Sequence, residues 1–261
     1  MKKINLFLIS IMFLGSYLFY QYLPAQLPMH WNIMGQVDNY MPKNQAVLLM
    51  PTMTLFIWIL FLVLPNFDPK KDKYKLFQKE WQIIQTTFIG FFFYLHFLIF
   101  YISTNSKVQM LPFMFIGLGT FFILLGNYLS KIRQNYFIGV KTPWSLSSED
   151  NWNKTHRYAS WCFVIAGIVT LIEATFVWHA PVVIFGSIML ASILPMVYSF
   201  LLFKKKPNLI KYVYFAIIAF VILLFSARLI SGEDNWICVK GKWIKHGKPS
   251  APMPKIGCKN N

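Results

Sequence analysis

The chain has 261 residues, of which 56% are hydrophobic and only 13% are charged. Soluble domains usually carry about 25% charged residues, so this composition excludes an ordinary water-soluble globular protein. The net charge of +16 would suggest nucleic-acid binding in a soluble protein, but neither a zinc-finger spacing nor an RNA-binding aromatic pattern accompanies it. We therefore expect a membrane protein without a nucleic-acid partner, whose basic residues set its orientation in the lipid bilayer.

The apolar residues fall in blocks of about 20, the length needed to cross about 30 Å of hydrocarbon. Seven such blocks predict an all-α, multi-pass protein of the cell membrane with about seven transmembrane helices. The first block lacks a small-residue cleavage site before Gln26, so we expect a retained anchor rather than a signal peptide. The predicted spans are Ile4–Leu23, Ala46–Leu64, Ile83–Ser103, Met110–Leu129, Ser160–Trp178, Val182–Phe203 and Leu209–Ile230.

The basic residues predict that the N-terminus lies in the cytosol. With this orientation the inner segments carry 16 lysines and arginines, whereas the outer loops carry only Lys43 and Lys107. Seven spans then place a short, Cys-bounded C-terminal tail outside the cell. The predicted regions are an N-terminal membrane region, 1–109, with an outer loop at 23–45; a membrane domain, 110–230, with an inner loop at 130–159; and an extracellular tail module, 231–261.

The first outer loop combines turn-forming residues with polar and aromatic side chains. Gly35 permits a turn, His30, Asn32 and Asp38 supply polar tips, and Trp31 suits a membrane interface. The loop is therefore either a docking surface for an extracellular ligand or a compact loop that packs on the helix ends. His30 and Asp38 offer only two plausible ligands, so we expect no metal site there.

The inner segment 126–157 has the most distinctive pattern in the chain. Ser147 or Ser148 can cap a short helix that has Glu149 and Asp150 in its first turn. This pattern predicts either an interfacial helix that anchors two spans or a cytosolic contact surface. The residues that we assign to contact with an inner partner are Lys131, Arg133, Asn135, Trp144, Trp152, His156 and Arg157.

Both patterned segments resemble a known family. The inner segment resembles the signature of the SdpI family of bacterial membrane proteins, and the outer loop resembles the domain of unknown function that commonly precedes it in longer members. The matching positions of the outer loop are Pro24, Pro28, His30, Asn32, Gly35 and Asp38. Those of the inner segment are Gly126, Asn127, Lys131, Arg133, Asn135, Gly139, Thr142, Pro143, Trp144, Leu146, Trp152, Thr155, His156 and Arg157.

The resemblance covers roughly residues 1–225 and departs from the family at two positions: Lys141 stands where an arginine is usual, and Ser130 where a proline is frequent. It implies immunity to a secreted toxin, membrane signal transduction, or both. The expected partners are a secreted toxin or peptide outside and a cytosolic repressor inside. The chain carries no paired catalytic carboxylates, no G-x-S-x-G, no H-E-x-x-H and no phosphate-binding glycine loop, so we expect neither an enzyme nor a cofactor.

Two ionisable residues, His96 and Glu173, lie inside predicted spans at similar depths. An intramembrane carboxylate is costly and suggests a function by default. One interpretation is a neutral Glu173 that is hydrogen-bonded within the bundle, with His96 as a candidate partner. The alternative is a small transporter or proton-coupled protein that uses both residues.

Cys238 and Cys258 bracket a Gly- and Pro-rich tail outside the family resemblance. In an oxidising compartment this pair predicts a disulfide, which would stabilise the tail by about 3 kcal/mol. The alternative is a metal site formed by Cys238, His246 and Cys258, although zinc–thiolate sites belong in reducing compartments.

Overall fold

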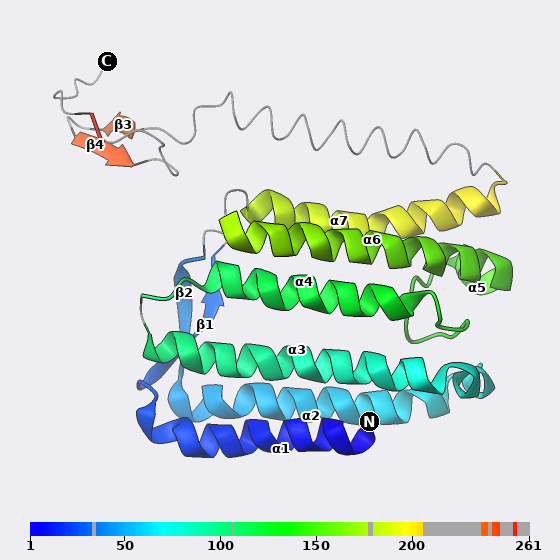
Figure 1. The fold of residues 1–261 in the computed structure, drawn as a ribbon, viewed down its shortest axis with the longest axis horizontal. Helices are drawn as coiled ribbons and strands as arrows, with labels where there is room; N and C mark the ends of the chain where they lie inside the picture. The colour runs from blue at the N-terminus through cyan, green and yellow to red at the C-terminus, as the bar shows by residue number, and fades with distance from the viewer. Residues whose placement is uncertain are drawn as a thin grey trace. The chain divides into compact units, whose positions relative to one another are not determined.

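The computed structural model describes residues 1–32, 35–105, 107–176, 180–205, 236–239, 242–245 and 253–254. Long helices dominate the first 205 residues (Figure 1). The helices are α1 (Lys2–Phe19), η1 (Tyr20–Tyr22), α2 (Lys43–Phe67), η2 (Lys71–Phe77), α3 (Gln78–Thr104), α4 (Met110–Leu129), α5 (Pro143–Ser147), α6 (Glu149–Phe176) and α7 (Ala180–Phe203). The strands are β1 (Gln26–Trp31), β2 (Val37–Pro42), β3 (Trp236–Val239) and β4 (Lys242–Lys245).

Six helices of the described residues are long and apolar enough to cross a membrane: α1, α2, α3, α4, α6 and α7. They correspond to the first six spans expected from the sequence, and they make the chain a multi-pass membrane protein. Large apolar side chains such as Phe7, Phe56 and Phe185 are more than 60% exposed, as lipid-facing residues must be. The seventh predicted span, Leu209–Ile230, lies outside the described residues.

The six spans pack in two groups. Helix α3 packs against α1 and α2, whereas α4 packs most extensively against α6, which in turn packs against α7. Helix α4 lies between α3 and α6 and joins the two groups (Figure 1).

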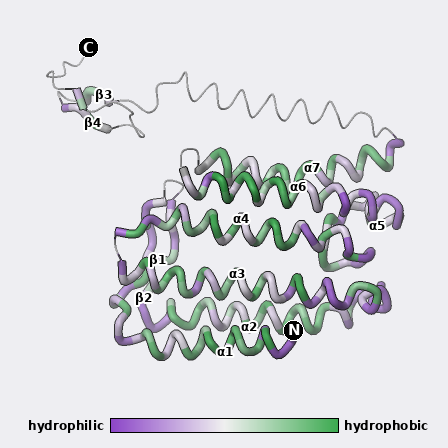
Figure 2. Tube along the Cα trace, in the orientation of Figure 1, coloured by the Kyte–Doolittle hydropathy of each residue, from purple (hydrophilic) through white to green (hydrophobic). Residues whose placement is uncertain are grey.

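Polar residues concentrate at the two ends of this helical unit, and the middle of the helices is apolar (Figure 2). The hairpin formed by β1 and β2 lies at one end, and α5 lies at the other. We call these the hairpin end and the α5 end. The basic-residue count predicts that the hairpin end is extracellular and the α5 end cytosolic.

Glycines allow α4 and α6 to approach each other closely. A Cβ atom added at Gly119 would lie 2.8 Å from the carbonyl oxygen of Gly167, and one added at Gly167 would lie 2.6 Å from the carbonyl oxygen of Gly119. One end of the contact is closed by Ser160, whose hydroxyl donates a hydrogen bond to the carbonyl oxygen of Gly126. Backbone-to-backbone packing of this kind holds helices together in lipid, where apolar side chains gain little by associating.

The tail forms a separate unit, in which β3 and β4 pair as an antiparallel hairpin with Cys238 opposite Trp243. The sequence had not predicted these strands. Cys258 and His246 lie outside the described residues, so the disulfide remains a prediction.

Candidate functional site

The outer loop folds into an antiparallel hairpin rather than an irregular turn-rich loop, which corrects the purely helical prediction. Asn32 and Gly35 form its tip. The backbone N–H of Asn32 donates to the carbonyl oxygen of Gln36 at 2.8 Å, and the Asn32 side-chain oxygen accepts from the N–H of Gln36 at 3.0 Å. Gly35 has φ +76°, and a Cβ there would collide with Leu111 of α4. Both residues therefore shape the tip and fix it against the helices.

The hairpin is anchored by apolar residues on one face. Leu27 is fully buried, and the half-buried Trp31 packs against the core formed by Leu98, Ile102 and Met110 of α3 and α4. The prediction that this segment packs on the helix ends is confirmed for these two residues. A surface held in this way is rigid, which favours recognition because little conformational entropy is lost on binding.

His30 and Asp38 form an exposed pair on the hairpin. Nδ1 of His30 contacts Oδ1 of Asp38, and the two side chains are 67% and 42% exposed. The structure thus brings together two of the residues that the sequence predicted as ligand contacts. No group of three metal-binding side chains occurs in the part of the chain that the structure describes.

The α5 end is organised around Trp152 and His156 of α6. Their rings stack, with centroids 3.9 Å apart and an interplanar angle of 21°. The Trp152 indole donates to the carbonyl oxygen of Ile132 at 2.9 Å. His156 Nε2 accepts the N–H of Val140 at 3.0 Å, and Nδ1 lies 2.9 Å from the Trp152 carbonyl oxygen. These partners require a neutral imidazole with its proton on Nδ1.

Gly139 lets the inner loop approach this histidine. Its φ is +113°, a conformation that side chains with a Cβ rarely adopt, and an added Cβ would overlap Nε2 of His156. The position of the His156 ring therefore requires a residue without a Cβ at position 139.

A buried carboxylate, Asp68, joins the two inner loops. It is 2% exposed and accepts hydrogen bonds from the Lys70 N–H at 2.7 Å, the Tyr74 hydroxyl at 3.0 Å and the Tyr136 N–H at 2.9 Å. The Lys70 ammonium also donates a hydrogen bond to the Gln134 side chain, so a second side-chain contact joins the same two loops. These bonds tie the loop after α2 to the loop after α4 and thereby couple the two helix groups.

A chain of hydroxyl groups connects the inner loop to α7. The Ser145 N–H donates to the Thr142 hydroxyl at 3.1 Å, which lies 2.7 Å from the Ser199 hydroxyl, and Ser199 donates to the Asn151 oxygen at 2.9 Å. Thr155 also donates to this oxygen, at 3.0 Å. Since all five residues are buried, the chain positions α5 rigidly on α6 and α7.

The burial pattern corrects the predicted inner contact surface. Asn135, Trp152 and His156 are fully buried and serve the fold, so they cannot touch a partner directly. Trp144 is half-buried, with its ring 4.9 Å from that of Phe200. The exposed members of the predicted set are Lys131, Arg133 and Arg157.

The two intramembrane ionisable residues do not pair. His96 is buried on α3, and its Nε2 lies 3.2 Å from the Ser16 hydroxyl of α1, whereas Glu173 is buried on α6. Helix α4 separates their two helices (Figure 1). The suggested His96–Glu173 contact is therefore wrong, because the sequence gives equal depths but not the order in which helices pack.

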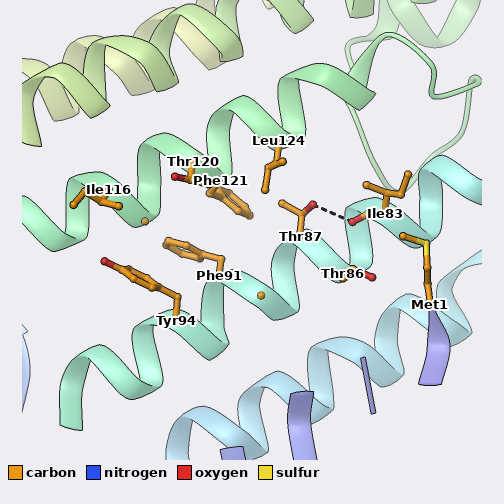
Figure 3. Close-up of a pocket in the computed structure, with 12 residues that line it drawn as sticks. Met1, Ile83, Thr86, Thr87, Phe91, Tyr94, Ile116, Thr120, Phe121 and Leu124 are labelled. Carbon is orange, nitrogen blue, oxygen red and sulfur yellow. Dashed lines mark hydrogen bonds between the residues drawn. The ribbon is translucent and has the colours of Figure 1, made fainter. Parts of the chain in front are cut away.

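A groove lies between α3 and α4 (Figure 3). Its volume is about 350 Å³, and Phe91, Tyr94 and Phe121 contribute aromatic walls. The Thr87 hydroxyl at its edge already donates to the carbonyl oxygen of Ile83 at 3.0 Å. None of the lining side chains is acidic or basic, so this groove suits an apolar group and provides no charged contact.

Sequence reasoning missed Asp68, Gln134, Asn151 and Ser199 as organisers of the α5 end. The Thr142–Ser145 pair had a usable signal, because Thr-Pro-x-Ser has the spacing of a helix cap, and the structure contains such a reciprocal cap. Asp68 and Ser199 had none, since Tyr136 is 68 residues from Asp68 and Thr142 is 57 residues from Ser199, and only the folded chain brings them together.

Comparison with known proteins agrees with this architecture. Residues 131–199 match the SdpI/YfhL protein family, and residues 7–55 match a domain of unknown function, DUF1648. The chain is 27% identical, over 208 residues, to the immunity protein SdpI of Bacillus subtilis (strain 168). This match covers 78% of the chain and 98% of the relative. No solved structure matches the chain. This multi-pass cell-membrane protein thus carries an SdpI/YfhL family domain that spans the inner loop, α5, α6 and most of α7, and a DUF1648 domain that spans most of α1, the hairpin and the first half of α2.

Proposed function

We propose that this protein is a non-enzymatic membrane protein that protects its cell from a secreted toxin and holds a cytosolic partner at the membrane. The observation that carries the proposal is the exposed His30–Asp38 pair on a hairpin whose other face is fixed to the bundle. The name of the Bacillus subtilis relative, an immunity protein that aligns over nearly its whole length, supports the same function.

The hairpin supplies the features of a recognition surface. His30 and Asp38 project a donor, an acceptor and a negative charge from neighbouring strands, while Leu27 and Trp31 hold the strands in place. The basic-residue count predicts that this surface faces outward, where an approaching toxin would meet it first. Binding there requires no catalytic residue.

The α5 end supplies a second surface of different character. Lys131, Arg133 and Arg157 are exposed. Lys131 and Arg133 lie on a loop that is fixed by the hydrogen bond from Trp152 to Ile132, and Arg157 lies on α6. Arginines are frequent anchors of protein interfaces, and their charge suits an acidic partner. The half-buried Trp144 provides apolar area beside α7.

The alternative of a proton-coupled transporter receives less support. Such a protein concentrates polar groups at mid-membrane, often on broken helices. In the described spans His96 is bonded to Ser16, and it is separated by α4 from the helix that carries Glu173. The larger groups of buried polar residues that the structure brings together, around Asp68 and around Thr142, lie at the α5 end.

The test is survival of cells that express the protein and are challenged with the secreted toxin encoded nearest its gene. His30→Ala and Asp38→Ala should each lower the tolerated toxin concentration about tenfold or more, equivalent to about 1.4 kcal/mol of lost contact. Membrane abundance should not change, because both side chains are exposed. Arg157→Ala should instead alter reporter output from the cytosolic partner.

Lys107→Ala is the matched control, because Lys107 is also exposed and lies in the next loop at the hairpin end. It should leave protection unchanged. Full protection by both hairpin variants, together with its loss in Glu173→Gln, would replace this proposal with the transporter.

A further inference from the structure

A cleft opens between α1 and α2 at the base of the hairpin. Its volume is about 550 Å³. The cleft lies on the bilayer-facing surface, since Tyr17 is 79%, Leu18 53% and Leu48 48% exposed. Such a surface is covered by lipid in a membrane. The residues that line it are Phe13, Ser16, Tyr17, Leu18, Tyr20, Gln21, Asn44, Val47 and Leu48.

The lining changes in polarity with depth. Gln21 of η1 and Asn44 of the first turn of α2 lie toward the hairpin, whereas Phe13 and Leu48 lie deeper in the spans. Amides near the hairpin and mainly apolar side chains deeper in the spans match the polar and apolar zones of a phospholipid. A water-soluble ligand would not need the apolar part.

A lysine beside the cleft lacks an acidic partner. The Lys43 ammonium donates to the carbonyl oxygens of Tyr20 at 3.1 Å and Leu23 at 3.0 Å, and it lies 4.5 Å from the centre of the Tyr20 ring. No acidic side chain pairs with it among the residues that the structure describes. An ammonium has three donors, so one N–H remains for an anion.

We propose that this cleft binds one anionic phospholipid of the leaflet at the hairpin end. The phosphate contacts Lys43, the ester region meets Gln21 and Asn44, and one acyl chain fills the apolar part beside Leu48. The bound lipid braces the junction of η1 and α2, from which the hairpin extends. This site is independent of the proposed immunity function.

The experiment is native mass spectrometry of the full-length protein with phosphatidylglycerol or phosphatidylcholine. One phosphatidylglycerol should remain bound at collision energies that remove phosphatidylcholine. Lys43→Gln should lower the preference for phosphatidylglycerol about fivefold, the effect of about 1 kcal/mol for one lysine at a lipid surface. Lys43→Arg should keep it, and Lys107→Gln, which removes an exposed lysine of the next loop at this end, should not change it.

Leu48→Trp tests the lipid site without changing Lys43. The larger side chain should fill the cleft that the acyl chain would occupy. It should lower the retention of both lipids while the thermal unfolding midpoint stays near that of the unmodified protein. Equal retention of the two lipids, an unchanged preference in folded Lys43→Gln, or full retention in Leu48→Trp would overturn the proposal. So would a bound species with the mass of a peptide or of a second copy of the chain.

Discussion

Gly139→Ala is expected to destabilise the protein by about 2–6 kcal/mol. The backbone at φ +113° costs a residue with a Cβ about 1–3 kcal/mol. The new methyl group also displaces Nε2 of His156 and leaves the buried N–H of Val140 without its acceptor, which adds about 1–3 kcal/mol. Denaturant unfolding of the purified protein in detergent measures the loss.

His156→Ala separates these two costs. In that background Gly139→Ala should cost only the backbone strain, so the two substitutions together should destabilise by less than the sum of each alone. Gly90→Ala is the control for glycine replacement, since open space surrounds that position in α3, and it should be neutral or slightly stabilising. Additive effects of the Gly139 and His156 substitutions would contradict the packing described here.

Gly167→Leu is expected to separate α4 from α6 at a cost of about 3 kcal/mol, the upper part of the usual range for over-packing. Its Cβ would meet the Gly119 carbonyl oxygen at 2.6 Å and the Ile123 nitrogen at 2.9 Å, and backbone atoms cannot move aside as a side chain can. The unfolding transition should therefore occur at lower denaturant concentration.

Gly186→Leu is the matched control for this substitution, because Gly186 is also on a spanning helix but has open space around its Cβ. It should unfold like the unmodified protein. If both variants lose the same stability, then leucine in these helices is harmful for a reason other than α4–α6 packing.

The spans were predictable because hydrocarbon imposes a length on apolar helices. The prediction for α4, Met110–Leu129, coincides with the structure. Helix α6 begins at Glu149, well before Ser160, the start of the predicted span. The short helix that the sequence predicted with Glu149 and Asp150 in its first turn is therefore the beginning of α6. The added turns are polar on one side, but Trp152, His156 and Ala159 are fully buried on the other, so counting apolar residues starts the helix too late.

The outer hairpin was harder to predict, because Pro24, Pro28 and Pro42 argue against strands. The structure accommodates Pro28 next to an irregularity in the strand pairing, between Pro28 and His30. The pairing of His30 with Asp38 depends on that register, so neither strand alone could have indicated it.

The buried polar contacts could not be derived from sequence either. Ser16 and His96 are 80 residues apart, and Asp68 and Tyr136 are 68 apart. Residue type shows that such groups need partners in a low-dielectric interior, but only helix packing decides which partners they meet.

The central claim is that the hairpin touches the toxin, and photo-crosslinking in living cells tests it most directly. Tyr40 is exposed on β2 and shares a strand face with Asp38, whereas Ser147 is exposed at the opposite, α5 end. A benzoylphenylalanine introduced at position 40 should yield a covalent adduct with the toxin, and one at position 147 should not. A toxin adduct at position 147, or none at position 40 in cells that remain protected, would contradict the account.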